Sequence, residues 1–457
     1  MRIFCLLFAL LNTAWAQPNI IFILTDDMSW TGTSVQLDPT VADSKSDFYL
    51  TPNIERLAAQ GMVFSAAYAP GPMCTPSRAA LLTGKTPAEL RMTTPGGGRA
   101  MDYHKLLSAN FIRDLPSSET TVAEALQEVG YATAHFGKWH LGSSAPGGHG
   151  FDVHDGNTNN EGAGTQSESN PKDIFGITQR AIAFIEEQVQ EQKPFYVQLS
   201  HYAVHTPIEA LEGSKTQFAQ MPSGSRHDGV DYAAMTWDLD MSVGRLLKRI
   251  AQLDLIDNTY IVLMSDNGAP SNPRQSFNRP LSGGKGSLYE GGIRVPLIVR
   301  GPDVIKGTFC TEPVSGCDLF PTFCEWAQVS LDDRAGSSLV PLLKLDRLAF
   351  KRTQAALLFH YPHYGQGPQQ RPQSALIVGQ YKLIKNWEDG SLELFNLKTD
   401  LEETDNLVMQ LPEIAADLNA QLNERLAQVM AALPKTNPDY DPKSGWPRRR
   451  GRELMAR

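Results

Sequence analysis

Short apolar runs alternate with helix-like patterns along most of this chain. A helical pattern over residues 121–130 precedes an apolar run at 131–136, and another over 173–188 precedes one at 194–200. Apolar runs of strand length that alternate with helices indicate a parallel sheet with helices on both faces. We therefore predict an α/β fold built on a large, mixed and mainly parallel sheet flanked by helices.

The pattern changes past about residue 345. Residues 375–386 and 391–397 have the pattern of antiparallel strands, and residues 411–433 that of a helix. A chain of 457 residues also exceeds the usual size of a domain with a single core. We predict a main domain over residues 17–345 and a smaller C-terminal α+β subdomain over residues 346–457.

The charge balance argues against one class of partner. The chain has 41 lysines and arginines against 50 acidic residues, a formal net charge of -9. A nucleic-acid-binding protein normally presents a basic face, so we expect no nucleic-acid partner. The one dense basic run, residues 447–457, is more typical of a solvated tail than of a binding site.

The first sixteen residues have the features of a secretion signal. Arg2 is followed by an apolar stretch and by Ala14-Trp15-Ala16, which resembles an A-x-A cleavage site. We predict that residues 1–16 are a signal peptide cut before Gln17, with the mature protein exported to the periplasm or the medium. The apolar stretch is too short to span a bilayer, and no later segment reaches about 18 apolar residues, so no stable membrane insertion is expected.

Four cysteines remain after that cleavage, too few for a disulfide scaffold. Cys317 and Cys324 lie in a predicted helix, where buried structural thiols are the simpler interpretation. A bridge from this helix to Cys310 stays open on the sequence alone. Cys74 stands apart from the other three and is treated below with its own motif.

Polar side chains follow four of the predicted strands, where ligands collect in open α/β sheets. One apolar run ends in Asp26 and Asp27, and another ends in Asp266 and Asn267. Two further runs are followed by Lys138 with His140, and by His205. One such end is weak support for a site, since Asp and Asn are common turn residues. Four together predict a site at this edge of the sheet.

The two acidic ends supply three carboxylates and an amide oxygen, which are hard ligands. No thiolate pair or HExxH helix points to zinc. We expect a hard divalent cation, Ca²⁺ first and Mg²⁺ second. Lys138, His140, His205 and Lys285 would supply positive charge or donors nearby, a combination that suits a tetrahedral dianion or an anionic ester.

Cys74 precedes a helix-forming run. Pro76 fits the first turn of this helix and Gly84 fits just past its end, which places Cys74 at or beside the helix N-terminus. Arg78 lies one turn further on, where it can pair with an anion. A buried structural cysteine and a plain thiolate nucleophile are both open interpretations, although a soft thiolate suits a cluster of hard-cation ligands poorly.

Residues 74–84, "CTPSRAALLTG", match without departure the C-x-P-S-R-x-x-x-L-T-G signature of the formylglycine-dependent (type I) sulfatases of the alkaline phosphatase superfamily. The chain also resembles that family in "NIIFILTDD", "GKWHLG", "AVHTP", "SDNG", "GGKGSLYEGGIRVP" and "LFNLKTDLEETDNL", in the same order. The resemblance implies an alkaline-phosphatase-like fold. It also implies that a separate maturation enzyme oxidises Cys74 to formylglycine, whose hydrate is the nucleophile.

The resemblance further assigns roles to the residues at the strand ends. Metal ligation would fall to Asp26, Asp27, Asp266, Asn267 and the modified Cys74. Arg78 and Lys138 would hold the hydrate and the sulfate, with Lys285 and His205 on the sulfate and the leaving oxygen. His140 would act on the second hydroxyl of the hydrate, so that sulfate leaves and the aldehyde is restored.

Other residues fall where this family often builds its substrate pocket. We expect leaving-group recognition from His104, from Arg279 and from the group around His360 and His363, against the alternative of ordinary packing or surface residues. The substrate we expect is a sulfated saccharide. The alternatives are a small aryl sulfate, a phosphatase or phosphonate hydrolase of the same superfamily, and a binding protein that keeps an unmodified Cys74. The oligomeric state is open.

Overall fold

The computed structural model describes residues 17–96, 101–160, 167–271, 277–330, 336–365 and 370–445. The predicted signal peptide, residues 1–16, lies outside this range. An eight-stranded sheet forms the centre of the molecule, in the order β10-β2-β9-β8-β1-β7-β5-β6. Its strands are β1 (Asn19–Thr25), β2 (Met62–Phe64), β5 (Ala132–Gly137), β6 (Val153–His154), β7 (Phe195–Ser200), β8 (Thr259–Ser265), β9 (Leu297–Arg300) and β10 (Thr308–Cys310).

The sheet is mixed and mainly parallel, as predicted. Strands β8, β1, β7, β5 and β6 pair in parallel, whereas β9 runs antiparallel to both β8 and β2. Every residue of β1 is buried. Ile20, Phe22 and Leu24 face one hydrophobic core, and Ile21 and Ile23 face the other. A strand buried on both faces requires a continuous apolar run, which β1 has.

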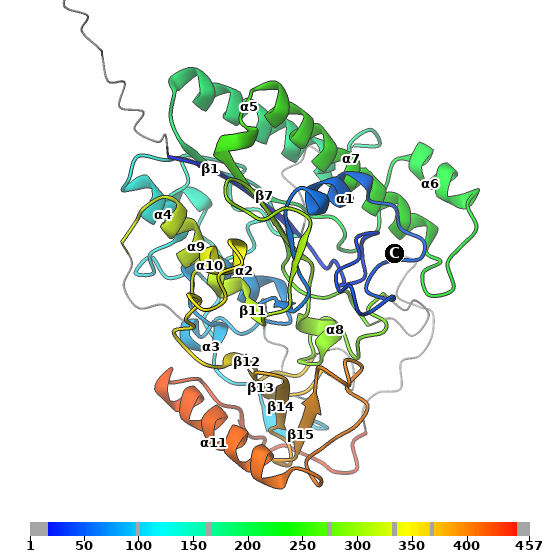
Figure 1. Ribbon diagram of the computed structural model, residues 1–457. Helices are drawn as coiled ribbons and strands as arrows, with labels where there is room; N and C mark the ends of the chain where they lie inside the picture. The colour runs from blue at the N-terminus through cyan, green and yellow to red at the C-terminus, as the bar shows by residue number, and fades with distance from the viewer. Residues whose placement is uncertain are drawn as a thin grey trace, which may run out of the picture.

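Helices cover both faces of the sheet (Figure 1). One layer contains α1 (Pro52–Ala59), α5 (Ile174–Glu191) and α7 (Val230–Gln252), and the other contains α2 (Cys74–Thr83), α4 (Val122–Gln127) and α9 (Leu319–Trp326). The shorter elements are α3 (Pro87–Leu90), α6 (Glu212–Ala219), α8 (Glu290–Ile293), α10 (Val340–Leu343), β3 (Ala67–Tyr68) paired with β11 (Val314–Ser315), and β4 (Leu106–Leu107) paired with β16 (Lys435–Thr436).

A second, antiparallel sheet follows the main one, as the change of pattern past residue 345 predicted. Its strands run in the order β12-β13-β14-β15, and α11 packs on one face (Figure 1). Leu418, Leu422 and Leu426 of that helix pack with Leu376 and Leu383 of the sheet. The elements are β12 (Leu357–Tyr361), β13 (Gln373–Val378), β14 (Tyr381–Asn386), β15 (Leu392–Asn396) and α11 (Pro412–Gln428).

A buried ionic cluster joins this small sheet to the main fold. The Lys382 ammonium on β14 lies 2.9 Å from Glu290 Oε1 at the start of α8, and 2.8 Å from Glu403 Oε1. Arg294 reaches the other oxygen of Glu290 at 3.0 Å. The side chains of Lys382 and Glu290 have no solvent exposure. Because each charge depends on its partners for stabilisation, the cluster ties α8 to the small sheet.

The four cysteines of the described residues, Cys74, Cys310, Cys317 and Cys324, are buried, and no disulfide joins them. Cys324 lies in α9, whereas Cys317 lies in the short 3₁₀ turn Gly316–Asp318 just before it, so the two thiols are the buried structural alternative but do not share one helix. Among the helices in the described ranges, none combines the length and the apolar character needed to cross a membrane.

Replacing Lys382 by Met leaves Glu290 and Glu403 buried without their shared cation. We expect the variant to lose about 3–5 kcal/mol of stability, because an uncompensated buried charge is costly. Thermal unfolding followed by circular dichroism measures the loss. Lys398→Met, at an exposed position in the turn after β15, is the matched control and should change stability by no more than about 0.5 kcal/mol. Equal melting temperatures for the two variants would contradict the role of the cluster.

Candidate active site

The acidic strand ends lie side by side because β1 and β8 are neighbours in the sheet. Asp26 and Asp27 follow β1 directly, and Asp266 and Asn267 follow β8. The Asp27 amide donates to Asp266 Oδ1 at 3.3 Å, and Asn267 Nδ2 donates to Asp27 Oδ1 at 2.6 Å. Asp27 has a left-handed backbone, with φ of 60°. All four side chains are buried.

Helix α2 brings Cys74 to the same place. Cys74 is the first residue of the helix, and Gly84 ends it in the left-handed conformation with φ of 68°, as the motif predicted. The Cys74 Sγ lies 3.3 Å from Asp26 Oδ1 and 4.0 Å from Asp27 Oδ1. The predicted nucleophile position therefore touches the predicted metal ligands.

Three cations neutralise the carboxylates. Arg78 Nε donates to Asp266 Oδ2 at 2.9 Å, and its Nη1 donates to the Lys138 carbonyl at 2.6 Å. The Lys138 ammonium lies 2.5 Å from Asp26 Oδ2. Lys285 Nζ lies 2.6 Å from Asp27 Oδ1 and 3.2 Å from Cys74 Sγ. Each of the three carboxylates is thus in direct contact with a cationic side chain.

Burial and the neighbouring charges set the protonation of this cluster. Burial alone would raise the pKa of Asp26, but Lys138 and Arg78 hold it well below its usual range. Burial and the charge of Asp26 raise the pKa of Asp266 to about 6. Burial, together with Asp26 and Asp266, raises the pKa of the Cys74 thiol to about 12. With these protein groups alone, the sulfur is therefore a protonated and weak nucleophile at neutral pH.

The donor set fits a hard divalent cation. Asp26, Asp27, Cys74 and His205 each offer one ligand atom, and these atoms lie within 4.8 Å of one another. Within the described residues, the buried Asp27 Oδ2 and Asn267 Oδ1 have no hydrogen-bond partner. Buried oxygens without partners are costly unless something else binds them. The predicted ligand Asp266 is not among these four residues, and its Oδ2 accepts from Arg78 Nε at 2.9 Å.

The two predicted histidines lie at the edge of the cluster. His140 adopts a left-handed backbone with φ of 58°, and its carbonyl accepts from Thr75 Oγ1, the neighbour of Cys74, at 2.8 Å. Burial and the charge of Lys138 lower the pKa of His140 to about 3, so its ring is neutral. His205 Nε2 lies 3.7 Å from Asp27 Oδ2, and its side chain is 17% exposed. Both rings can accept or relay a proton at the cluster.

The four residues expected to recognise the substrate differ in their surroundings. The His104 ring stacks on Tyr364 with centroids 3.9 Å apart. His363 is buried against Thr93 Oγ1 at 2.7 Å. His360 is buried in β12, and both of its ring nitrogens lie within hydrogen-bond distance of protein oxygens, Ser374 Oγ and the Ala432 carbonyl. Arg279 is exposed.

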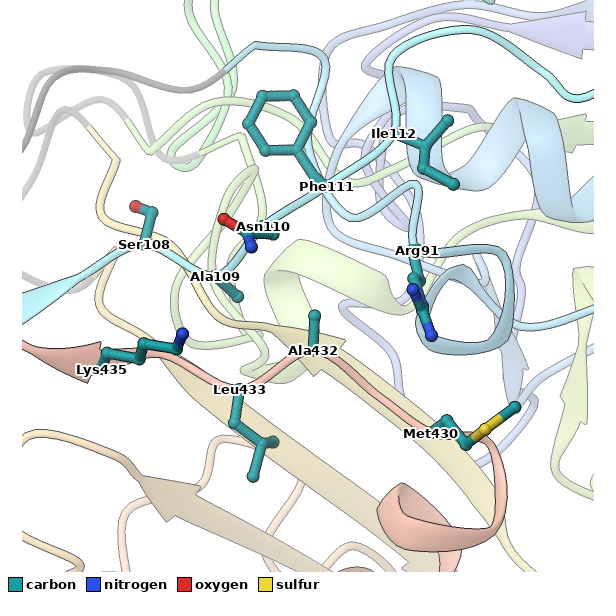
Figure 2. Close-up of a pocket in the computed structure, with 10 residues that line it drawn as sticks. All are labelled: Arg91, Ser108, Ala109, Asn110, Phe111, Ile112, Met430, Ala432, Leu433 and Lys435. Carbon is teal, nitrogen blue, oxygen red and sulfur yellow. The ribbon is translucent and has the colours of Figure 1, made fainter.

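A cavity of about 370 Å³ lies next to the loop that carries His104. Figure 2 shows residues 108–112 and 430–435 on opposite sides of it, with the Phe111 ring at one end. Arg91 and Lys435 add positive charge to a lining that is otherwise partly apolar. The cavity is lined by neither the cysteine nor the carboxylates of the cluster.

A further cation near the cluster was not predicted. Lys172 is buried, and its ammonium interacts electrostatically with Asp26, Asp27 and Lys138. No motif marks this lysine, because it precedes α5 in a segment that has the composition of a surface loop. Only the three-dimensional arrangement places it beside the strand ends.

Comparison with known proteins agrees with this geometry. The sulfatase family model matches residues 18–329, and a model of the N-sulphoglucosamine sulphohydrolase C-terminal region matches residues 284–432. A sulfatase of Formosa agariphila is 29% identical over 493 residues, covering 90% of this chain and 88% of that protein. The N-acetylgalactosamine-6-sulfatase of Sus scrofa is 30% identical over 414 residues, covering 81% and 73% respectively.

Solved structures show the same architecture. Ps i-CgsB in complex with k-i-k-neocarrahexaose is 25% identical, with a TM-score of 0.73 and coverage of 90% of this chain and 93% of that one. The phosphonate monoester hydrolase of Agrobacterium radiobacter shares the fold at 17% identity, with a TM-score of 0.64 and coverage of 92% and 97%. Because the sulfatase model matches most of the chain, this protein belongs to the sulfatase family and is a sulfuric ester hydrolase.

Proposed function

We propose that this protein hydrolyses a sulfate ester of a saccharide through a formylglycine made from Cys74. The observation that carries the proposal is the position of Cys74 Sγ, which lies in contact with Asp26 Oδ1 and Lys285 Nζ among hard-cation ligands. A thiol that burial keeps protonated has little use there as a nucleophile. Oxidation to an aldehyde, hydrated to a geminal diol, would supply oxygen in place of sulfur, which suits such ligands.

Asp26, Asp27, Asp266 and Asn267 would hold the divalent cation, Ca²⁺ in preference to Mg²⁺. When bound, that cation would supply Lewis-acid stabilisation of negative charge on the ester oxygens. Arg78, Lys138 and Lys285 lie around Cys74 and would bind and orient the sulfate in a buried site.

The two histidines would handle the protons. His205 is partly exposed and would protonate the oxygen of the departing alcohol. His140 is neutral, with Nδ1 lacking a hydrogen-bond partner within the described structure, and would accept the proton of the second hydroxyl. The division follows from their surroundings. The Asp27 carboxylate beside His205 favours a proton on that ring, whereas burial and the charges of Lys138 and Arg78 lower the pKa of His140.

The relatives support a saccharide as the alcohol. One is named for N-acetylgalactosamine 6-sulfate, another is an ulvan-active sulfatase, and a solved structure holds a carrageenan oligosaccharide. The buried His104 ring stacks on Tyr364, which is half-buried and offers a flat ring with a polar hydroxyl of the kind that sugars contact. We propose that this pair recognises the sugar, whereas His360 serves the packing of β12.

The N-terminal residues support export. We propose that residues 1–16 direct the chain to the periplasm or the medium and are removed.

Protein co-expressed with a formylglycine-generating enzyme should release sulfate from at least one sulfated galactan or glycosaminoglycan oligosaccharide. Cys74→Ala should lower the rate by about a thousandfold or more, because it removes the nucleophile. Cys74→Ser should release at most one alcohol per chain, since a single hydroxyl cannot expel the sulfate. Ion chromatography of sulfate, with mass spectrometry of the Cys74 peptide, provides the readout. Activity confined to nitrophenyl sulfate, or phosphate release in place of sulfate, would overturn the saccharide assignment.

Removing the metal should abolish turnover and lower stability together. Dialysis against a chelator leaves Asp26, Asp27 and Asp266 without the cation, and we expect the rate to fall about a hundredfold or more. The melting temperature should also fall, because the cation binds the folded state alone. Added Ca²⁺ should restore both more fully than Mg²⁺. A chain shown by elemental analysis to be free of metal, yet fully active, would contradict the proposal.

The mature protein from its native host should begin at Gln17. Intact mass and N-terminal peptide analysis of the secreted and periplasmic fractions measure this directly. Ala14→Leu with Ala16→Leu removes the small residues at the cleavage site and should leave residues 1–16 attached. Protein found only inside the cell with Met1 in place would rule out export.

A further inference from the structure

Lys172 lies in a strained segment just before α5. It is the middle residue of a short 3₁₀ turn, Pro171–Asp173, and both Lys172 and Asp173 have a φ of 53°. Residues other than glycine adopt this left-handed conformation uncommonly. Two in succession persist only where the surroundings hold them, which is a feature of functional sites.

The surroundings that hold this segment are ionic. Arg180 of α5 lies 2.6 Å from Asp155 and 2.6 Å from Asp173. Asn170 Nδ2 donates to Asp173 Oδ1 at 2.8 Å, and Asn170 Oδ1 accepts from the Phe175 amide at 3.0 Å. These contacts fix the backbone on both sides of Lys172 and leave its own side chain unused.

The Lys172 side chain is buried without a direct partner. The residue is 2% exposed, and among the described residues no hydrogen bond or ion pair joins its ammonium to another side chain. Burial lowers the pKa of Lys172, while Glu209, Asp26 and Asp27 oppose that shift. A buried cation without an anion in contact is costly, so a ligand that supplies the anion would be favoured there.

Neighbouring charges and hydrogen bonds indicate where Lys172 lies relative to the strand ends. Glu209 is the strongest acidic influence on Lys172, ahead of Asp26 and Asp27, and it follows His205 along the chain by four residues. Lys138 and Lys285, in contrast, contact the carboxylates of Asp26 and Asp27 directly. Hydrogen bonds tie the segment that carries Lys172 to the end of β5. The Asp155 carboxylate that pairs with Arg180 also accepts from the Gly137 amide at 2.7 Å, and Gly137 directly precedes Lys138.

We propose that Lys172 binds a second anionic group of the substrate, a carboxylate or a sulfate on the same saccharide beside the ester that is hydrolysed. This inference rests on the proposed function and narrows its substrate class to saccharides with two neighbouring anionic groups. The cations around Cys74 suffice for one sulfate. Lys172 interacts electrostatically with Asp26 and Asp27, but it forms no ion pair with a carboxylate that the structure describes.

Matched substrates that differ by one anionic group test the inference. Suitable pairs are D-glucosamine 6-O-sulfate with the 2-N,6-O-disulfate, κ- with ι-carrageenan oligosaccharides, and N-acetylgalactosamine 6-sulfate with its glucuronate-containing disaccharide. In whichever pair is hydrolysed, the wild-type protein should have the higher kcat/KM for the more highly charged member. Lys172→Met should lower this ratio about 10- to 100-fold, the usual loss for a hydrogen bond to a charged group.

Two further variants serve as controls. Lys172→Arg keeps the charge and should retain part of the preference. Lys215→Met removes a lysine of α6 that is 33% exposed and pairs with Glu212, so the ratio should equal that of the wild-type protein. Melting temperatures of all variants, compared with the wild type, verify that each is folded.

The possible failures are distinguishable. A wild-type protein that hydrolyses the singly and doubly charged members equally well overturns the inference and leaves the proposed function intact. An equal loss with Lys172→Met on every substrate, nitrophenyl sulfate included, shows that Lys172 serves the scissile sulfate or the fold, and also overturns it. If the wild-type protein releases no sulfate from any saccharide, that result overturns the proposed function and also the inference about Lys172.

Discussion

The contact between Lys138 and Asp26 is one of several charge pairs on which the arrangement of this site depends. Three carboxylates, those of Asp26, Asp27 and Asp266, are buried together at the ends of two neighbouring strands. Their mutual repulsion in a medium of low polarity would disfavour the folded state unless it were balanced. Lys138, Lys285 and Arg78 each contact one of the three. The formal charges of these three carboxylates and three cations therefore sum to zero. A bound divalent cation would make the site positive, and an anionic ester would balance that positive charge.

The sheet topology makes this balance possible. Strands β8, β1, β7 and β5 are consecutive neighbours and run in parallel, so their carboxyl ends open onto one region. Gly137 at the end of β5 lies so close to β7 that an added Cβ would be 2.1 Å from the Ser200 carbonyl oxygen, and its φ is 94°. A side chain there would push Lys138 away from Asp26. Close packing of the strand ends therefore helps to keep the Lys138 ammonium beside the Asp26 carboxylate.

Local patterns predicted the central residues of the site because each of those residues directly follows an apolar run or starts a helix with clear end signals. Asp26, Asp266 and Cys74 have such positions. The other residues of the site were predicted from the family motifs, which occur in the same order along this chain. His360 shows the limit of this reasoning. Its place in a histidine-rich stretch indicated a pocket residue, but whether a strand residue faces solvent or the core depends on the packing of α11 and the 430–435 segment. Lys172 could not be found at all, because no motif marks it and its burial appears only in the three-dimensional packing of the segment before α5.

The outer part of the site depends on different interactions from its centre. The loop that carries His104 is held by the C-terminal segment, where β16 pairs with β4 and Asn437 Nδ2 donates to the carbonyls of Met101 and His104 at 3.0 and 2.8 Å. These are backbone contacts that tolerate changes of side chain in the loop. The central charges have no such tolerance, because removing any one leaves another buried without a partner. On the proposed function, a single hydrolytic centre would be combined with different saccharides through changes in the loops and in peripheral cations such as Lys172, while the residues at the strand ends stay the same.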